Sequence, residues 1–399
     1  MTIGDVLRGP WRAVPVLGIT QIVAWGAIYY SPVLLVPLIA AERGWSLTFA
    51  MAGFSLCLLV AGLALPLVGR AIDHFGGHVV MTGGSLIGAL GLVGLSYVEQ
   101  PAAYLAIWLV VGLGLAASLY DAAFATLGRI FAMAARRPIT VLTLAGGFAS
   151  TVGWPTTHYL IDAIGWKGAY LVYAGLLVAI CAPLHAFALP RACASSETRP
   201  DGTSRDKRDP ALPPEGLPFL LVAAAFASYA FVPSALAAHL LAIFGRSGID
   251  PGTAVTIGAL FGPAQVLARV CELSFEGSIH PLGVARGALG LLIGAFVLLA
   301  VAGFSVPAAT AFAVMFGAAN GLLTIARGAV PLALFGAGGY GRLIGRIAGP
   351  SLIMQAIAPF VLASVAEHAS DSFALGVTAA FAAIAFACFV AIRRPRAER

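Results

Sequence analysis

The feature that most constrains this chain is a succession of long apolar runs separated by short polar segments. A helix that crosses a bilayer needs about 20 apolar residues. Because backbone amides in hydrocarbon must be hydrogen-bonded within their own segment, each run is predicted to be a helix. Twelve such runs lie near residues 14–40, 46–68, 79–98, 102–131, 139–164, 168–188, 217–244, 251–274, 282–303, 306–330, 343–365 and 372–392. The run at 102–131 is long, and its helix could be shortened or kinked.

Composition supports this interpretation. Only 10% of the residues are charged and 60% are hydrophobic, whereas a soluble domain is about 25% charged. A soluble enzyme, a nucleic-acid-binding protein and a disordered scaffold are therefore excluded. The net charge of +6 does not indicate nucleic acid, because the basic residues occupy short loops rather than one solvated face.

The longest polar interruption, residues 190–216, divides the runs into six and six. Its polar and charged composition is typical of a flexible linker. We therefore expect an all-α polytopic membrane protein with twelve transmembrane helices. An N-terminal six-helix bundle at 1–189 would be joined by a cytoplasmic linker at 190–216 to a C-terminal six-helix bundle at 217–399.

Lysine and arginine are distributed unequally between the two sides of this topology. With the N-terminus cytoplasmic, the external loops hold only Arg43, Lys167 and Arg246. The positive-inside rule then places both termini and the linker in the cytoplasm. We expect a multi-pass protein of the cell inner membrane, surrounded by lipid and functional as a monomer.

Motifs of enzyme chemistry are absent from the sequence. The five cysteines show no paired or metal-type spacing. No G-x-S-x-G segment and no phosphate-binding loop occurs. We therefore expect no enzymatic activity, no cofactor, no metal and no nucleic-acid partner.

The loop after the second run carries a recognisable motif. Residues Gly69 to His78 read GRAIDHFGGH, which resembles the G-x-x-x-D-R-x-G-R-R loop of the major facilitator superfamily. Gly69, Asp73 and Gly76 match, whereas His74 replaces the arginine and Gly77-His78 replaces the basic pair. The resemblance implies that Asp73 belongs to an inside gate, where it could face a helix N-terminus or an arginine. The alternative is an ordinary polar turn.

Other segments resemble the monocarboxylate-transporter branch of that superfamily, most closely its bacterial monocarboxylate/oxalate type. They are GWS at 44–46, RRP at 136–138 and GWKGAY at 165–170. In the eighth run, Arg269 falls on the arginine of an aspartate-x-x-x-arginine segment and Gln265 replaces the aspartate. The resemblance implies two pseudo-symmetric six-helix bundles and the transport of a carboxylate.

Ionisable residues inside a bilayer are costly and mark pathways or pairs. Arg269 is our first candidate, as a fixed cation that binds a substrate carboxylate. The alternative is a structural pair with Glu272, one turn further on. Asp121 and Arg327 occupy the fourth and tenth runs. They could form a latch that closes the inward mouth, Asp121 could carry a coupling proton, or the two could be a structural ion pair. Glu272 and the gate residue Asp73 complete the candidates for proton coupling or gating.

Five polar residues are weaker candidates for substrate binding. Tyr29 and Tyr30 precede Pro32, where a proline break could expose their hydroxyls, although they could equally serve packing. His158 could bond a carboxylate or titrate, or it could be a satisfied interhelical histidine. A set of amides, Gln265 and Asn320, could bind substrate or join helices.

These features predict a secondary active transporter that moves a small organic anion, monocarboxylate-like, by alternating access. Transport would be proton-coupled or proceed by anion exchange. A proton-driven exporter of amphipathic drugs or metabolites is the alternative, although the glycine-proline pair of the antiporter signature is interrupted by Trp154. A non-transporting membrane sensor is the third hypothesis.

Overall fold

The computed structural model describes residues 9–191, 216–274 and 279–392. Every element among these described residues is a helix, and none is a strand. The expectation of an all-α chain is therefore confirmed. Most of the expected linker, residues 192–215, lies outside the described residues.

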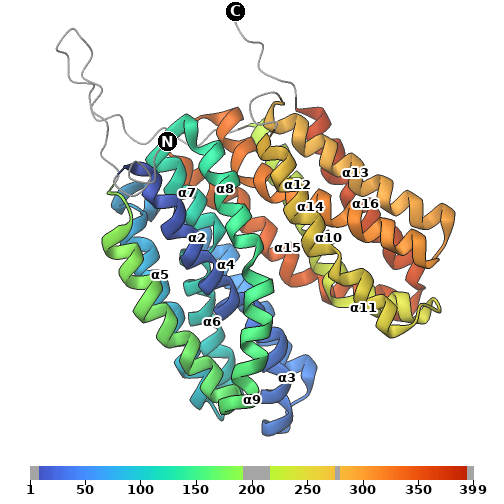
Figure 1. Ribbon diagram of the computed structural model, residues 1–399, viewed down its shortest axis with the longest axis horizontal. Helices are drawn as coiled ribbons and strands as arrows, with labels where there is room; N and C mark the ends of the chain where they lie inside the picture. The colour runs from blue at the N-terminus through green and yellow to red at the C-terminus, as the bar shows by residue number, and fades with distance from the viewer. Residues whose placement is uncertain (1–8, 192–215, 275–278, 393–399) are drawn as a thin grey trace, which may run out of the picture. The chain divides into compact units, whose positions relative to one another are not determined.

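The chain forms two compact units (Figure 1). Unit 1 comprises Met1–Pro214 and Phe335–Arg346, and unit 2 comprises Glu215–Leu334 and Ile347–Arg399. The first turns of α15 thus make their contacts in unit 1, whereas the rest of that helix packs in unit 2.

Unit 1 is built mainly from the helices of the first half of the chain. In chain order these are α2 (Ala13–Ala24), the π-helical η2 (Trp25–Tyr30), α3 (Ser31–Arg43), α4 (Leu47–Phe75), α5 (Gly77–Tyr97), α6 (Pro101–Ser118), α7 (Tyr120–Phe131), α8 (Arg136–Gly147), α9 (Ala149–Leu176), and the π-helical η4 (Leu177–Cys181) and η5 (Leu184–Ala188).

Unit 2 contains the helices of the second half. They are α10 (Leu217–Arg246), α11 (Pro251–Ala259), α12 (Phe261–Ser274), α13 (Pro281–Ala302), α14 (Val306–Phe335), α15 (Tyr340–His368) and α16 (Asp371–Ala391). Ring contacts such as Phe231 with Phe381, whose centroids are 4.0 Å apart, hold α10 against α16.

Ten stretches of the described chain are long and apolar enough to cross a membrane. Nine of them each match one expected run, and the remaining stretch, Pro101–Ala188, covers three. Two residues with positive φ divide that stretch, Ala132 at 49° and Gly165 at 73°. The twelve runs are therefore all recovered as helical segments of a multi-pass membrane protein.

Several spans are interrupted inside their length, among them the fourth and the first. The kink expected in 102–131 is confirmed at Leu119, whose extended backbone separates α6 from α7. The amide of Gln21 donates to the Ser118 carbonyl at 2.7 Å, which satisfies one group that the break frees. In the first span the expected break is π-helical. Pro32 has no N–H to bond the carbonyl four residues earlier, and the hydrogen-bond register shifts just before it.

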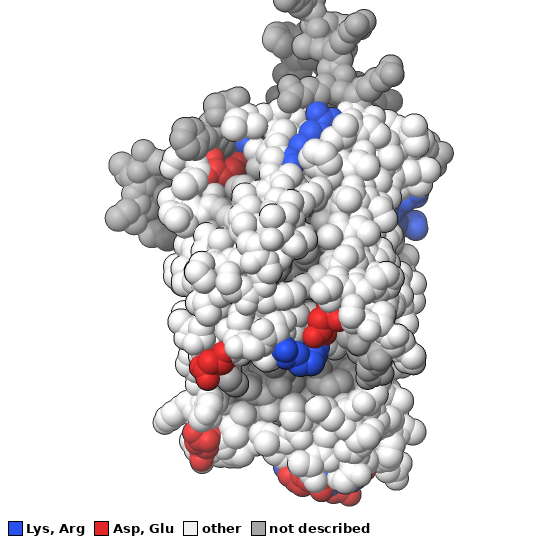
Figure 2. Space-filling model, turned by 90° about the vertical axis from the view of Figure 1, so that its right-hand side faces the viewer, with Lys and Arg blue, Asp and Glu red and all other residues white. Residues whose placement is uncertain are grey.

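The outer surface of unit 2 is apolar. Val297 and Val301 of α13 are 55% and 82% exposed, and Ile384 of α16 is 48% exposed. Figure 2 shows this side of the molecule as largely white, with few blue or red patches. Such a surface is suited to lipid, because apolar side chains need no water there.

Candidate functional site

Arg269 lies buried inside unit 2. It belongs to α12 and is 3% exposed. Its Nη2 donates to Oε1 of Gln265, one turn earlier, at 3.3 Å. Its Nε donates to the backbone carbonyl of Gly321 on α14 at 3.4 Å. Both of these acceptors are uncharged oxygens.

Two glycines let α14 approach α12 closely enough for a backbone carbonyl of α14 to accept a hydrogen bond from Arg269. A Cβ on Gly321 would lie 2.6 Å from the carbonyl oxygen of Gln265, and a Cβ on Gly317 would lie 2.7 Å from that of Phe261. Real side chains do not tolerate such approaches, so these positions require glycine. The contact of the two backbones is what places the Gly321 carbonyl beside Arg269.

A tyrosine that the sequence analysis did not select completes this region. The hydroxyl of Tyr229, on α10, donates to Oδ1 of Asn320 on α14. Tyr229 is 8% exposed, and Glu272 of α12 is also buried, at 7%. The sequence does carry a signal for Tyr229, because its hydroxyl is a polar group inside the apolar run at 217–244. Arg327, further along α14, is partly buried.

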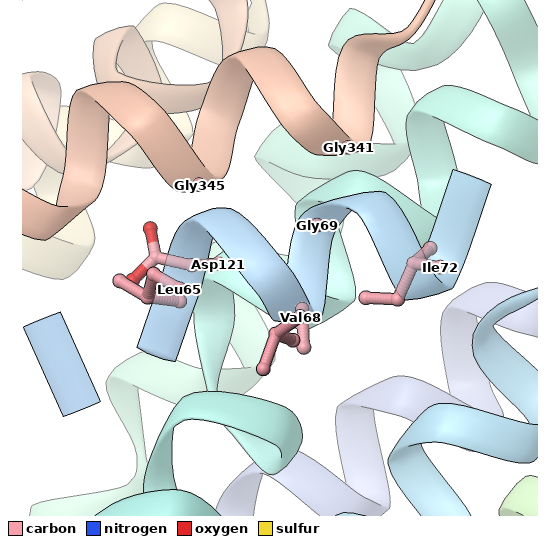
Figure 3. A pocket seen from close by; sticks show the side chains of 8 residues that line it. Leu65, Val68, Gly69, Ile72, Asp121, Gly341 and Gly345 are labelled. Carbon is pink, nitrogen blue, oxygen red and sulfur yellow. The ribbon is translucent and has the colours of Figure 1, made fainter. Parts of the chain in front are cut away.

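Asp121 is the corresponding buried acid of unit 1. It is the second residue of α7, directly after the break at Leu119, and is 9% exposed. Its carboxylate therefore lies at a helix N-terminus, where negative charge is favoured. Figure 3 shows Asp121 beside Leu65, where α4 crosses the first turns of α15.

The side chain of Asp73, near the end of α4, is hydrogen-bonded to the start of α15. Its Oδ1 accepts a hydrogen bond from the backbone N–H of Gly341 at 2.9 Å, and its Oδ2 accepts one from that of Arg342 at 2.7 Å. Nearby, Arg129 of α7 donates to the Ile72 carbonyl at 2.9 Å. The carboxylate thus satisfies two N–H groups that have no partner within the helix.

The same helices cross with almost no space between their backbones. A Cβ on Gly69 would overlap the carbonyl oxygen of Gly341, and a Cβ on Gly345 would overlap that of Leu65. Figure 3 shows the three glycines along this crossing. We call this contact of Gly69, Gly341 and Gly345 the glycine crossing.

Tyr29 and Tyr30 belong to a group of aromatic rings around η2. The Tyr29 ring centroid lies 4.8 Å from that of Trp25, 5.5 Å from that of Tyr30 and 5.6 Å from that of Phe54. Tyr30 also meets Trp154 of α9 at 5.8 Å. Both tyrosines are partly exposed.

His158 is not the interhelical histidine considered as an alternative. Its Nδ1 lies 3.0 Å from Oδ2 of Asp162 on the same helix, and the two side chains are 74% and 67% exposed. The i, i+4 spacing in the sequence is the signal that was missed. One face of α9 lines an open hollow of about 680 Å³, which we call the α9 hollow; its residues are Thr151, Trp154, Pro155, His158, Tyr159 and Asp162.

The candidates thus fall into two sets. Those of unit 2 are Arg269, Gln265, Glu272, Asn320 and Arg327, and those of unit 1 are Asp73, Asp121, Tyr29, Tyr30 and His158. Asp121 and Arg327 belong to different units, and their pairing stays a prediction. The described part of the chain holds no group of three or more side chains placed to bind a metal.

Comparison with known proteins identifies relatives. The family model of the Major Facilitator Superfamily matches residues 17–274. Monocarboxylate transporter 6 of Mus musculus is 30% identical over 153 residues, which are 38% of this chain and 30% of that protein. Monocarboxylate transporter 4 of Mus musculus is 31% identical over 182 residues, 45% of this chain and 36% of that protein. The aligned regions span about a third of the length of these relatives.

Solved structures match over nearly the whole chain. The human organic anion transporter MFSD10 (TETRAN) superposes with a TM-score of 0.75 at 17% identity, covering 95% of this chain and 99% of that one. FucP in the outward conformation superposes with a TM-score of 0.72 at 12% identity, covering 96% and 99%. These similarities establish the fold.

Proposed function

Because this chain belongs to the Major Facilitator Superfamily and is a transporter related to monocarboxylate transporters, we propose that it moves a small organic anion across the cell inner membrane. Transport proceeds by alternating access, coupled to a proton or to the exchange of another anion. Both termini are cytoplasmic and the monomer is the functional form. The positive-inside distribution of Arg and Lys supports this orientation.

The observation that carries this proposal is the burial of Arg269 within a membrane span. Placing a charged side chain within a membrane span costs free energy. Binding a substrate anion is a function that requires such a charge. The guanidinium can offer a fork of N–H donors that matches the geometry of a carboxylate. Tyr229, Asn320 and Gln265 supply hydrogen-bonding groups in the same unit.

The test is uptake of radiolabelled monocarboxylates by proteoliposomes that contain the wild type, Arg269→Lys or Arg269→Gln. We expect Arg269→Gln to reduce uptake at least tenfold and Arg269→Lys to retain part of the wild-type uptake. The control is Arg246→Gln, which removes an exposed arginine whose partner is Asp371. If Arg269→Gln transports as well as the wild type, the anion-pairing role is wrong.

We further propose that a buried carboxyl group carries the coupling proton. Asp121 and Glu272 are the candidates, since both lie within membrane spans and both are at least nine-tenths buried. Neutralising the coupling residue, by Asp121→Asn or Glu272→Gln, is expected to abolish proton-driven accumulation while leaving substrate exchange intact. If accumulation persists in both variants, coupling does not use these residues.

Gating is assigned to Asp73 and, on the sequence argument, to Arg327. The two hydrogen bonds from the start of α15 support the role of Asp73, because a carboxylate at a helix N-terminus holds that helix in place. Cysteine labelling from the cytoplasmic side tests it. Asp73→Asn should change the labelling rate, and an unchanged rate would remove Asp73 from the gate.

The alternative, an exporter of amphipathic compounds, is favoured by the partly exposed aromatic rings of unit 1. It predicts that efflux of such compounds survives Arg269→Gln. The variant therefore distinguishes the two functions directly.

A further inference from the structure

We infer that the starts of α2 and α8 together form a binding site for the headgroup phosphate of an anionic phospholipid. The site consists of the guanidinium groups of Arg12, Arg136 and Arg137 beside the ring of Trp11, and all of these residues belong to unit 1. This inference concerns a lipid of the surrounding membrane and does not depend on which anion is transported.

The two helices run side by side in the same direction. Trp11 lies in η1 (Pro10–Arg12), the short 3-10 turn that leads into α2, and Cζ of Arg137 lies 5.9 Å from the centroid of its ring. Further along both helices, a Cβ on Gly18 would lie 3.2 Å from Cβ of Ala145. Contacts at both places mean that the two N-termini lie at one end of unit 1. The positive-inside distribution assigns this end to the cytoplasm.

Positive side chains gather where the helix dipoles are already positive. Arg12 is the N-cap of α2, and Arg136 and Arg137 are the first two residues of α8. In both helices, which the structure describes from end to end, the first turn contains no acidic residue and no side chain caps the N-terminus. The N-terminus of a helix favours an anion, whereas cations there are repelled by the dipole. A bound anion would offset this repulsion.

Arg12 also has a donor that the described residues do not satisfy. Its Nε is buried and has no hydrogen-bond partner among them, although the residue as a whole is partly exposed. A buried donor of a charged group that lacks a partner costs free energy. A phosphate oxygen is a suitable acceptor, because the guanidinium fork matches the geometry of a phosphate group.

The arginines lie at the depth of the lipid headgroups. Arg12 comes just before Val14, where the first apolar run begins, and Arg137 comes just before Ile139, where the fifth begins. Because such runs occupy the hydrocarbon core, the residues that precede them lie in the headgroup region. The phosphate groups of the membrane are therefore at the level of these guanidinium groups.

The ring of Trp11 holds the site together and suits the same depth. It meets the ring of Phe131 on α7 edge-on, with centroids 5.4 Å apart, and carries the Arg137 guanidinium over its face. The ring attracts a cation in this position, so Arg137 is held beside the start of α2 before a lipid arrives. Tryptophan is enriched at the membrane interface. Met133, in the turn between α7 and α8, is 59% exposed and offers an apolar contact for the acyl chain.

The combination of positive charge with apolar contacts favours a lipid over a soluble anion. Basic pockets between transmembrane helices on the cytoplasmic side bind anionic headgroups. A zwitterionic headgroup such as phosphatidylcholine carries its own cation, which the arginines repel. We therefore expect the site to prefer phosphatidylglycerol, whose headgroup has a net negative charge.

Native mass spectrometry of the full chain in detergent tests this preference. The Kd of the first bound lipid is measured for dioleoylphosphatidylglycerol and for dioleoylphosphatidylcholine, which have the same acyl chains. We expect the wild type to bind phosphatidylglycerol at least tenfold more tightly. Arg12→Gln and Arg137→Gln should each weaken this binding at least threefold, and the Tm of each variant without added lipid shows whether it is folded. Equal Kd values for the two lipids in the wild type would overturn the inference without use of any variant.

The matched control is Arg70→Gln, which removes an exposed arginine near the end of α4 in the same unit. Its Kd for phosphatidylglycerol should equal that of the wild type. If Arg70→Gln weakens binding as much as Arg12→Gln does, the lipid responds to general charge and no defined site exists. A competition with glycerol phosphate, which has the phosphate without acyl chains, separates the two sources of phosphate. Displacement of the lipid at equal concentration would assign the site to a soluble anion and overturn the inference.

Discussion

The carboxylate of Asp73 accepts a hydrogen bond from the backbone N–H of Arg342 at 2.7 Å, across 269 positions of sequence. Because Gly341 donates to the other oxygen, one side chain satisfies two N–H groups in the first turn of α15. Both donors are backbone N–H groups, and the N-terminus of a helix favours the negative charge that accepts them.

Asp73→Asn is expected to loosen the first turn of α15. The amide retains one acceptor oxygen and loses the charge, and a hydrogen bond to a charged group contributes about 1.5–3 kcal/mol. Hydrogen–deuterium exchange of the Gly341 and Arg342 amides should accelerate at least tenfold. Glu99→Gln, at an exposed acid beside Arg43, serves as control. Unchanged protection in Asp73→Asn would show that packing alone holds the turn.

Gly69→Ala should separate α4 from the start of α15. The new Cβ has no space, because it overlaps the Gly341 carbonyl, and overpacking of this kind costs about 1–3 kcal/mol. Gly83→Ala is the matched control, since a Cβ there meets nothing within 4 Å. Thermal unfolding in detergent should show a lower Tm for Gly69→Ala only. Equal Tm values would mean that the glycine crossing opens without cost.

Gly321→Ala should impair anion binding without touching Arg269 itself. The added Cβ would lie 2.6 Å from the Gln265 carbonyl, so α14 must move and take the Gly321 carbonyl away from the guanidinium. We expect KM for a carboxylate to rise several-fold. Gly290→Ala, on α13 with nothing within 4 Å, should leave KM unchanged. A similar rise in both variants would point to general loosening of unit 2.

Tyr229→Phe tests the neighbouring hydrogen bond. It removes the donor to Asn320, which is partly buried, and the loss of a typical hydrogen bond costs about 0.5–1.5 kcal/mol. The Tm should fall in Tyr229→Phe and remain constant in Tyr97→Phe, since Tyr97 is 68% exposed. If the Tm of Tyr229→Phe does not change, a different group satisfies Asn320.

The membrane spans were predictable because every helix that crosses lipid needs about 20 apolar residues, and the length of an apolar run shows this directly. The i, i+4 spacing of His158 and Asp162, which share a helix face, would also have been enough to predict their contact. The crossing of Gly69 with Gly341 was not predictable in this way. A glycine in the sequence indicates that another part of the chain can approach closely. It does not indicate which distant segment of backbone makes that approach. Tyr229 was missed for a similar reason, since its partner Asn320 lies on another helix.

The π-helical segment from Trp25 to Tyr30 affects how this chain aligns with homologues. An i→i+5 hydrogen bond includes one residue more than an α-helical bond. Each residue of an α-helix turns about 100° around the axis, so an extra residue in a regular α-helix would rotate everything that follows, whereas the wider π-helical turn absorbs it. A homologue that lacks one residue between Trp25 and Ser31 and is α-helical there would therefore present the same side of α3 to its neighbours. A gap at this point changes which side chains the turn itself presents and leaves the register of α3 unchanged.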